Sequence, residues 1–397
     1  MTTQSNDRKL EALAVQVELP ASAYERAVER FKDLGAWLGR KESSLYGFDP
    51  HVFAQGSFAL GTAIAPPDKR ENYDLDLSCN LRSGVTRLTH TQRQLKELLQ
   101  RELETYRKAR NIQDQLEEKN RCWRVHYQGH PGFHMDTVPG IPVDDSRRKE
   151  LTALMEKKIT MDSALAASVA NESMWITDRH NPSYSRIGPD WEASNPIGYL
   201  TWFQSRIDGS LEELTKDAKI TAVPFYERKS TLQRAIQLLK AHRDKMFLKF
   251  PDSKPISIII TTLAARVYRP TTSLSEAMTV ILAELTRFRN SGESELLNPT
   301  NPAESFTDKW AHVQYTKHAL KENFNVWVEQ VTKDFEVYLT AGTEQSLIKE
   351  ANDRFGVSPE PVLLKASLVA APDSVHLERR PPRVEVRSDS PRPYTCS

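Results

Sequence analysis

The sequence predicts an α+β fold made of two lobes. Its 397 residues exceed one average domain and can bury a sizeable core. Short runs typical of strands concentrate in the first half, whereas apolar residues at helical spacing dominate the second half. Strands followed by helices indicate an α+β lobe and then a helical lobe. The expected division is a short polar N-terminus at 1–20, an α+β lobe at 21–205, a helical lobe at 206–365 and a disordered C-terminal tail at 366–397.

The α+β lobe is expected to begin with one long helix, from about Ser22 to Gly39, because apolar residues recur there at helical spacing. An extended segment, His51 to Phe58, leads into a Gly56-Ser57 turn. The next strand is expected from Tyr73 to Leu81, where polar and apolar side chains alternate.

The rest of this lobe is expected to hold an amphipathic helix and two strands. The helix runs from Arg87 to Ala109, with its leucines on one side. The strands, Cys122–Tyr127 and Phe133–Val138, are joined by a Gly- and Pro-rich turn at 128–132. The second strand contains Asp136.

The second half is expected to be mostly helical. Helices are expected at 195–207, 227–247, 254–267, 273–288 and 310–339, with a Pro- and Asn-rich loop at 296–310 before the last one. From Ala371 onward, Pro, Arg and Ser replace apolar residues. Such a segment buries too little apolar surface to offset its ordering entropy, so it is expected to be disordered.

Charge and cysteine content narrow the classes of function. Lysine and arginine number 54 against 53 acidic residues, which argues against a broad nucleic-acid-binding surface but is compatible with a local basic cleft. Cys79, Cys122 and Cys396 are too few and too scattered for a disulfide framework or a zinc site. The N-terminus lacks a signal-peptide pattern, and no apolar run approaches the roughly 20 residues that cross a bilayer. We expect a cytoplasmic protein without a membrane segment.

The stretch from Gln55 to Leu77 carries the first chemical signal. On a strand, Asp74 and Asp76 point to one face about 7 Å apart, and paired carboxylates suit divalent cations that prefer oxygen ligands. Gly56 and Ser57 offer backbone N–H groups and a hydroxyl of the kind that hold phosphate oxygens. Each pair is weak alone, because an Asp-x-Asp is usually a solvated strand edge.

A third carboxylate, Asp136, lies between residues of opposite parity and can face the same cleft. All three aspartates sit within apolar runs, where an unpaired charge would be costly and a bound cation would remove the cost. In this order the residues indicate phosphoryl or nucleotidyl transfer with two Mg²⁺ ions, for which Mn²⁺ could substitute. Asp74 and Asp76 would hold the pair of ions, and Asp136 would complete the second site.

Three segments, QGSFALGT, ENYDLDLS and FHMDTVPGIP, resemble the DNA-polymerase-β-like nucleotidyltransferases. More narrowly, they are similar to the bacterial cyclic-GMP-AMP-synthase-like enzymes (CD-NTases) and to oligoadenylate synthases. SNPIGYLTWF, TLQRAIQLLKAHRD, KPISIIITTLAA and NPTNPAESFTDKW extend the similarity over residues 20–345. The resemblance implies a polymerase-β-like nucleotidyltransferase core with the N-terminal helix as a long spine and a C-terminal helical lobe. It matches the three aspartates to the metal triad and Gly56-Ser57 to the phosphate-binding turn.

In the helical half, the resemblance matches Lys240 and Ser257 to positions that contact the triphosphate. Without it, a lysine at the polar edge of an amphipathic helix is usually solvated, and Ser257 could equally cap its helix. Arg234, Tyr226 and Asn301 are nucleotide contacts by position only, and core packing is the more ordinary role for Tyr226.

The resemblance implies synthesis of a cyclic di- or trinucleotide from NTPs, ATP among them, with Mg²⁺ and release of pyrophosphate. It further implies bacterial anti-phage (CBASS) signalling through a separate effector, and a partner conjugated to the C-terminus in some members. The zinc insertion of the animal enzymes is missing from this sequence, so activation by double-stranded DNA is not implied. Two alternatives stay open: a linear oligonucleotide or tail-adding polymerase, and a non-catalytic binding module on the same fold.

Overall fold

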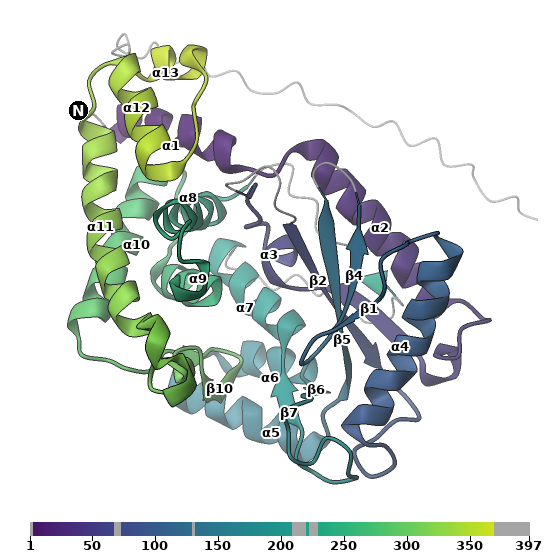
Figure 1. The fold of residues 1–397 in the computed structure, drawn as a ribbon. Coiled ribbons are helices and arrows are strands. Elements are labelled where there is room, and N and C mark those ends of the chain that lie inside the picture. Colours follow the sequence, from purple (N-terminus) through teal and green to yellow (C-terminus); the bar gives the residue numbers. More distant parts are fainter. Residues whose placement is uncertain (1–2, 67–72, 129–131, 209–219, 222–228, 369–397) are drawn as a thin grey trace, which may run out of the picture.

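The computed structural model describes residues 3–66, 73–128, 132–208, 220–221 and 229–368. A mixed sheet and a large group of helices lie side by side, with the helices of the second half on the left of the sheet in Figure 1. Among the described residues the sheet has eight strands, in the order β3-β4-β5-β2-β1-β8, with β6 paired to β5 and β7 to β6. The predicted α+β fold with a helical lobe is confirmed.

Four strands form the centre of the sheet: β1 (Pro50–Ala54), β2 (Tyr73–Leu81), β4 (Trp123–Tyr127) and β5 (Phe133–Pro142). β2 and β5 are parallel to each other, and β1 and β4 pair with them antiparallel. The shorter strands are β3 (Glu117–Glu118), β6 (Met174–Ile176), β7 (Glu192–Ser194) and β8 (Ile220–Thr221). The strands predicted along β2, β4 and β5 are confirmed.

Helices occupy most of the remaining described chain. Those of the first half are α1 (Thr3–Val17), α2 (Ala21–Gly39), α3 (Gly56–Ala59), α4 (Gln92–Ala109), α5 (Asp145–Leu154), α6 (Ser163–Asn171) and α7 (Pro196–Asp208). Those of the second half are α8 (Thr231–Met246), α9 (Ser257–Val267), α10 (Leu274–Asn290), α11 (Leu320–Thr340), α12 (Glu344–Phe355) and α13 (Pro361–Leu368). Shorter 3₁₀ or π turns lie at Tyr46–Phe48, Met155–Ile159, Pro251–Ser253, Asp308–Trp310 and Val313–His318.

The two faces of the sheet differ because side chains alternate along each strand. On one face Leu75 of β2 and Met135 of β5 are fully buried. The spine helix α2 covers this face together with α4 (Figure 1), and the Tyr73 hydroxyl donates to the carbonyl of Ala23 in α2 at 2.9 Å. The opposite face of the sheet carries polar side chains, among them Asp74, Asp76 and Asp136.

The N-terminal segment differs from the prediction. Residues 3–17, expected to be part of a short polar N-terminus, form α1. Lys9 of α1 is buried and donates from Nζ to the carbonyls of Leu339 and Ala341, at 2.6 and 2.9 Å, where α11 ends. The segment starts with polar residues but continues with an apolar stripe at the helical spacing i, i+3, i+4 and i+7. All four residues of the stripe are buried: Leu10, Leu13, Ala14 and Val17.

Two helices begin later in the chain than the apolar pattern predicts, and in each a side-chain cap marks the start. Helix α4 begins after Thr91, whose hydroxyl accepts from the N–H of Gln94 at 3.1 Å. Helix α8 begins after Ser230, whose hydroxyl accepts from the N–H of Gln233 at 3.3 Å. The residues predicted to start the last long helix, 310–318, form mainly 3₁₀ turns instead.

The loop predicted at 296–310 contains a short hairpin of β9 (Leu297–Asn298) and β10 (Asn301–Ser305). The side-chain oxygen of Asn298 accepts from the N–H of Thr300 at 3.0 Å, which closes the turn without a glycine.

The predicted tail lies mostly outside the described residues, which end at 368. Its first residues, 366–368, belong to α13 rather than to a disordered segment. In the described ranges, no helix combines the length and the apolar character needed to cross a bilayer.

Candidate active site

The Gly56-Ser57 segment lies against the second aspartate of β2. It opens the one-turn helix α3 directly after β1. Gly56 has a φ of +64°, and a Cβ at this position would collide with the carboxylate of Asp76. Backbone conformation and the approach of Asp76 therefore both require glycine here. The N–H of Gln55 donates to the main-chain carbonyl of Asp76 at 2.8 Å and ties the two segments together.

Three aspartates and an arginine share the polar face of the sheet. Asp76 is in register with Asp136 on β5, and Asp136 is in register with Arg124 on β4. Asp74 has the same parity as Asp76 and keeps 58% of its side chain exposed. We refer to Asp74, Asp76 and Asp136 as the carboxylate cluster.

Arg124 is ion-paired with two members of the cluster. Its Nε and Nη2 donate to Oδ1 and Oδ2 of Asp136 at 2.7 and 2.8 Å, a two-pronged contact. Nη2 also lies 3.4 Å from Oδ1 of Asp74. The hydrogen bonds to Asp136 raise the pKa of Arg124 above its already high ordinary value, so the guanidinium is always charged.

Asp76 is the perturbed acid of the cluster. Burial, followed by the negative charges of Asp136 and Asp74, raises the pKa of Asp76 to about 7, while Arg124 and Lys240 act in the opposite direction. Three carboxylates this close are costly to ionise together. The site therefore favours an additional positive charge.

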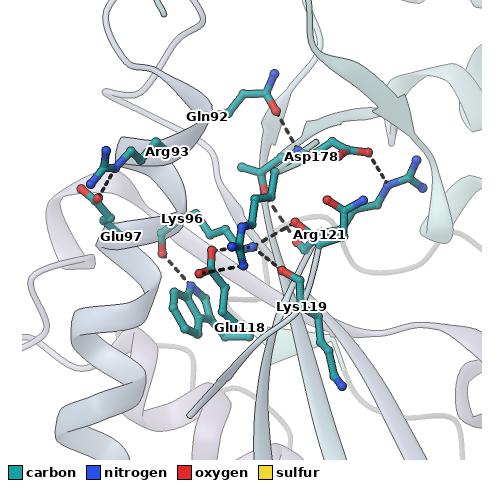
Figure 2. Close-up of polar contacts among 12 residues, drawn as sticks. Gln92, Arg93, Lys96, Glu97, Glu118, Lys119, Arg121 and Asp178 are labelled. Carbon is teal, nitrogen blue, oxygen red and sulfur yellow. Dashed lines mark hydrogen bonds and ion pairs between the residues drawn. The ribbon is translucent and has the colours of Figure 1, made fainter. Parts of the chain in front are cut away.

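Strand β4, which carries Arg124, is fixed at its start by a buried lysine. Lys96 of α4 lies at the centre of the network in Figure 2, where its Nζ donates to the carbonyl of Asn120 at 2.9 Å and pairs with Glu118 at 3.1 Å. The indole N–H of Trp123 donates back to the carbonyl of Lys96 at 3.0 Å. The turn between β3 and β4 is thus bound to α4 immediately before Arg124.

Helix α8 docks on the loop that follows α3. Three of its side chains, at spacing i, i+4 and i+7, donate to backbone carbonyls of this loop: Gln233 to Leu60 at 2.9 Å, Gln237 to Ala63 at 2.7 Å and Lys240 to Thr62 at 2.7 Å. This stripe joins the helical lobe to the sheet lobe just after the Gly56-Ser57 segment.

Lys240 is buried, with 5% of the residue exposed, so the ordinary expectation of a solvated lysine is wrong here. Burial, and next the charge of Arg243, lower the pKa of Lys240 to about 7, while Asp244 and Asp76 act to raise it. An ammonium in this position gains from any anion that enters the cavity.

Ser257 is the first residue of α9, and it does not cap this helix because Ile256 holds the cap position. Its Oγ accepts from Nη1 of the buried Arg243 at 2.7 Å. Arg243 also donates to Asp244 at 2.7 Å, and Asp244 accepts from Lys254 at 3.0 Å. Because Ser257 acts as acceptor to Arg243, its hydroxyl hydrogen can serve another acceptor. We call Lys240, Arg243, Lys254 and Ser257 the basic wall.

A cavity of about 590 Å³ separates the polar face of the sheet from the basic wall. Ser57 and Asp74 line it from the sheet lobe, and Lys240 and Ser257 line it from the helical lobe. The other predicted residues, Gly56, Asp76 and Asp136, are not in the lining, although Gly56 abuts Asp76 and Asp136 is in register with it.

The carboxylate cluster fits a divalent cation by chemistry rather than by its present arrangement. Within the described ranges, no three acidic, histidine or cysteine side chains converge as metal ligands. Arg124 engages both oxygens of Asp136. The donor set nevertheless consists of carboxylate oxygens, which Mg²⁺ prefers, and three carboxylates share one arginine as their ion-pair partner among the described residues.

Sequence reasoning missed Arg124, Gln233, Gln237 and Arg243. Of the contacts expected by position alone, Arg234 pairs with Glu11 of α1. Asn301 accepts from Arg147 at 3.3 Å. Neither Arg234 nor Asn301 lines the cavity, and their contact with nucleotide stays a prediction. Tyr226 lies outside the described residues.

Comparison with known proteins gives matches over the catalytic lobe and over most of the chain. Residues 50–139 match the nucleotidyltransferase domain of the cyclic GMP-AMP synthase DncV-like family. A c-di-GMP synthase of Roseivirga ehrenbergii is 32% identical over 319 residues, which cover 78% of this chain and 73% of the relative. The cyclic dinucleotide synthase CdnG of Bradyrhizobium diazoefficiens is 25% identical over 332 residues, covering 79% and 73%.

The fold is also similar to a solved structure. The structure of Bradyrhizobium diazoefficiens CdnG in complex with GTP superimposes with a TM-score of 0.60 at 18% identity, covering 91% of this chain and 98% of that one. The identity and coverage shared with the Roseivirga enzyme are sufficient to assign a family. The chain belongs to the CD-NTases, the DncV-like nucleotidyltransferases.

Proposed function

We propose that this protein joins two nucleoside triphosphates into a cyclic dinucleotide and releases pyrophosphate. One observation carries the proposal: Asp74 of the carboxylate cluster lines the same cavity as Lys240 and Ser257 of the basic wall. A metal-bound triphosphate needs carboxylates for its metal and cations or hydroxyls for its phosphates. The names of the relatives support a dinucleotide product, and GTP in the CdnG structure supports GTP as a substrate.

Ser57, Lys240 and Ser257 would bind the triphosphate of the donor nucleotide. All three line the cavity. The Ser257 hydroxyl has its hydrogen available, because Arg243 already uses the oxygen as acceptor. The Lys240 ammonium, whose pKa burial lowers to about 7, would be stabilised in its charged form by the phosphates.

Asp74, Asp76 and Asp136 would hold two Mg²⁺ ions, or Mn²⁺ in their place. When bound, such ions neutralise charge on the attacking and leaving oxygens of an in-line displacement. Asp136 would accept the proton of the acceptor ribose hydroxyl as its oxygen bonds to the α-phosphorus. The bond from that phosphorus to the bridging oxygen breaks, and pyrophosphate leaves. A second round within the linear dinucleotide closes the ring and releases a second pyrophosphate.

The cellular role we propose is anti-phage signalling of the CBASS type in the bacterial cytoplasm. The cyclic product would act on a separate effector protein. The C-terminal tail, which from residue 369 lies outside the described residues, would be the segment conjugated to a partner protein. ATP is a second candidate substrate beside GTP.

The test is incubation of the purified protein with each NTP, singly and in pairs, with Mg²⁺ or Mn²⁺. We expect pyrophosphate release from GTP and a product that resists phosphatase, with the mass of a cyclic dinucleotide. A phosphatase-sensitive ladder would instead indicate a linear oligonucleotide polymerase. A protein that releases no pyrophosphate under any of these conditions would be a binding module.

A further inference from the structure

Arg124 stands inside the carboxylate cluster as a built-in cation. Of the cations that the structure describes, it alone is ion-paired with cluster members. We propose that Arg124 is a resident counter-cation and positioning residue: it holds Asp136 in place and gives up Asp74 when a divalent cation binds. The inference rests on the proposed function in one respect, namely that the carboxylate cluster binds a divalent metal ion.

The contacts of Arg124 are unequal in a way that defines this role. Both oxygens of Asp136 accept from the guanidinium, at 2.7 and 2.8 Å, and the Asp136 side chain is only 14% exposed. The contact to Asp74 is long, at 3.4 Å, and the Asp74 side chain is largely exposed to the cavity side. A buried, two-pronged pair is harder to separate than a single exposed contact. An incoming cation therefore competes with Arg124 first at Asp74.

The charge balance of the cluster explains why one arginine is both needed and insufficient. Three carboxylates share the polar face with the single guanidinium of Arg124. Asp76 makes no ion pair among the described residues, although it lies in register with Asp136 and on the same face of β2 as Asp74. A cation in the free protein limits this repulsion, and the remaining negative charge still attracts a divalent ion.

The backbone around Arg124 is held on both sides, which favours a positioning role over a role that requires the strand to move. Arg124 follows Trp123, whose indole is hydrogen-bonded to Lys96, in the network of Figure 2. On its other side β4 is paired with β5 through the register Val125 to Met135. Since the backbone is fixed on both sides, the exchange at Asp74 requires a movement of side chains only.

The test measures metal binding by the full-length protein without nucleotide, from the rise in Tm across a Mn²⁺ titration. Arg124→Gln should lower the Tm in metal-free buffer and tighten apparent Mn²⁺ binding about two- to fivefold, the range expected for a partly exposed ion pair. Arg121→Gln is the matched control, because Arg121 lies three residues before Arg124, on the β3–β4 turn, but pairs with Asp178 and Glu192. It should leave Mn²⁺ binding unchanged. Asp74→Asn should weaken it.

A second readout separates positioning from simple competition. At saturating Mn²⁺, Arg124→Gln should lower kcat about 10- to 100-fold with little change in KM, because Asp136 has lost the fork that orients it. Arg124→Lys keeps the charge without the fork, so it should retain near-wild-type Mn²⁺ binding yet still lose turnover. This variant also serves if Arg124→Gln does not fold.

Mn²⁺ binding that is unchanged or weaker in Arg124→Gln would overturn the counter-cation role, even if the wild type makes a cyclic product. A wild-type protein that binds Mn²⁺ but releases no pyrophosphate from any NTP would refute the proposed function and leave the metal comparison intact. A wild type whose Tm does not respond to Mn²⁺ would overturn the inference, and the product assay would then decide the function separately.

Discussion

The two sides of the cavity carry opposite charges, and each side contains one side chain of the opposite sign. The carboxylate cluster gathers three negative side chains with one arginine, Arg124, among them. The basic wall gathers three positive side chains with one aspartate, Asp244, among them. Each side is held together in the free protein by a single opposite charge. They differ in construction, because strand register assembles the first and helix docking assembles the second.

The pKa shifts on the two sides mirror each other. Burial and acidic neighbours raise the pKa of Asp76 to about 7, and burial lowers the pKa of Lys240 to about 7. Both shifts favour the neutral form of the group. In the proposed complex, a metal-bound triphosphate would bring a cation to Asp76 and an anion to Lys240, so it would restore both charges at once. The comparison teaches that each side lacks a charge opposite to its own: a cation at the carboxylate cluster and an anion at the basic wall.

Removing the negative side alone should give the largest effect. The double variant Asp74→Asn, Asp76→Asn keeps side-chain size but deletes two metal-ligand charges. Pyrophosphate release from NTP with Mg²⁺ should fall at least about 10³-fold. Binding of metal-free NTP, measured by calorimetry, should persist because the basic wall is untouched.

The matched control for this loss is Asp49→Asn. Asp49 pairs with Arg82 near the far end of β2, at 2.8 Å, and its φ of +50° is one that asparagine tolerates. The control should turn over like the wild type. Wild-type turnover by the double variant would show that the cluster does not hold the metal.

Removing the positive side should give the next largest effect. Lys240→Met keeps the length of the buried stem but deletes the ammonium. The KM for NTP should rise about 10- to 100-fold, the cost of one charge-assisted contact, and kcat should change less. Steady-state kinetics over a wide NTP range would check this. An unchanged KM would remove Lys240 from the triphosphate site.

The pH dependence of NTP affinity should sharpen the same comparison. With a pKa of about 7, the Lys240 ammonium is charged below pH 7 and loses its proton as the pH rises above that value. Wild-type affinity should therefore fall between pH 7 and pH 9, by at most about tenfold per pH unit. The Lys240→Met variant has no ammonium to titrate, so it should lack this fall, and any pH dependence that remains belongs to Asp76, whose pKa is also about 7. A level wild-type curve would contradict the shifted pKa.

The negative side could be predicted from the sequence because strand geometry is local. Alternation along β2 put Asp74 and Asp76 on one face, and the strand bounds agree with the prediction. Arg124 was also within reach. A hairpin whose turn is centred on residue 130 pairs residues equally distant from that centre, which sets Arg124 opposite Asp136 as observed.

The positive side could not be predicted in this way, because its contacts join distant parts of the chain. Gln233, Gln237 and Lys240 bind carbonyls that lie 173, 174 and 178 residues away. A backbone carbonyl has no residue identity, so no sequence pattern marks it. Lys240 and Ser257 were reached through the family resemblance alone. Their place in the cavity agrees with it, whereas their contact with nucleotide stays a prediction.

Each lobe also contains a buried histidine that should respond to acid. Burial lowers the pKa of His51, on β1, to about 4, and that of His242, on α8, to about 3. His242 accepts from the indole of Trp327 at 3.2 Å and contacts Asp334 at 2.9 Å, which fits a neutral ring that donates from Nε2. In the unfolded chain both histidines would titrate near pH 6.5.

The stability that each of these histidines contributes should therefore be complete above pH 6.5 and should fall as the pH drops from 6.5 toward 4, because at these two rings only the unfolded state takes up protons there. The expected loss is about 1.4 kcal/mol per pH unit for each histidine. Denaturant unfolding at pH 7 and pH 5 would measure it. His51→Gln and His242→Gln should each remove their own share of the slope, whatever their effect at pH 7. Equal slopes in all three proteins would mean that neither ring is held neutral.

The smallest effect should come from the support of the basic wall rather than from its contacts with the ligand. Arg243→Lys keeps the charge but loses the fork that reaches both Ser257 and Asp244. The KM for NTP should rise about three- to tenfold at nearly constant kcat, because Ser257 is no longer held as a donor toward the cavity. Arg266→Lys is the matched control, since Arg266 lies on the same α9 helix as Ser257 but pairs with Glu284. If the control raises KM as much, the loss reflects the packing of the lobe and not the orientation of one hydroxyl.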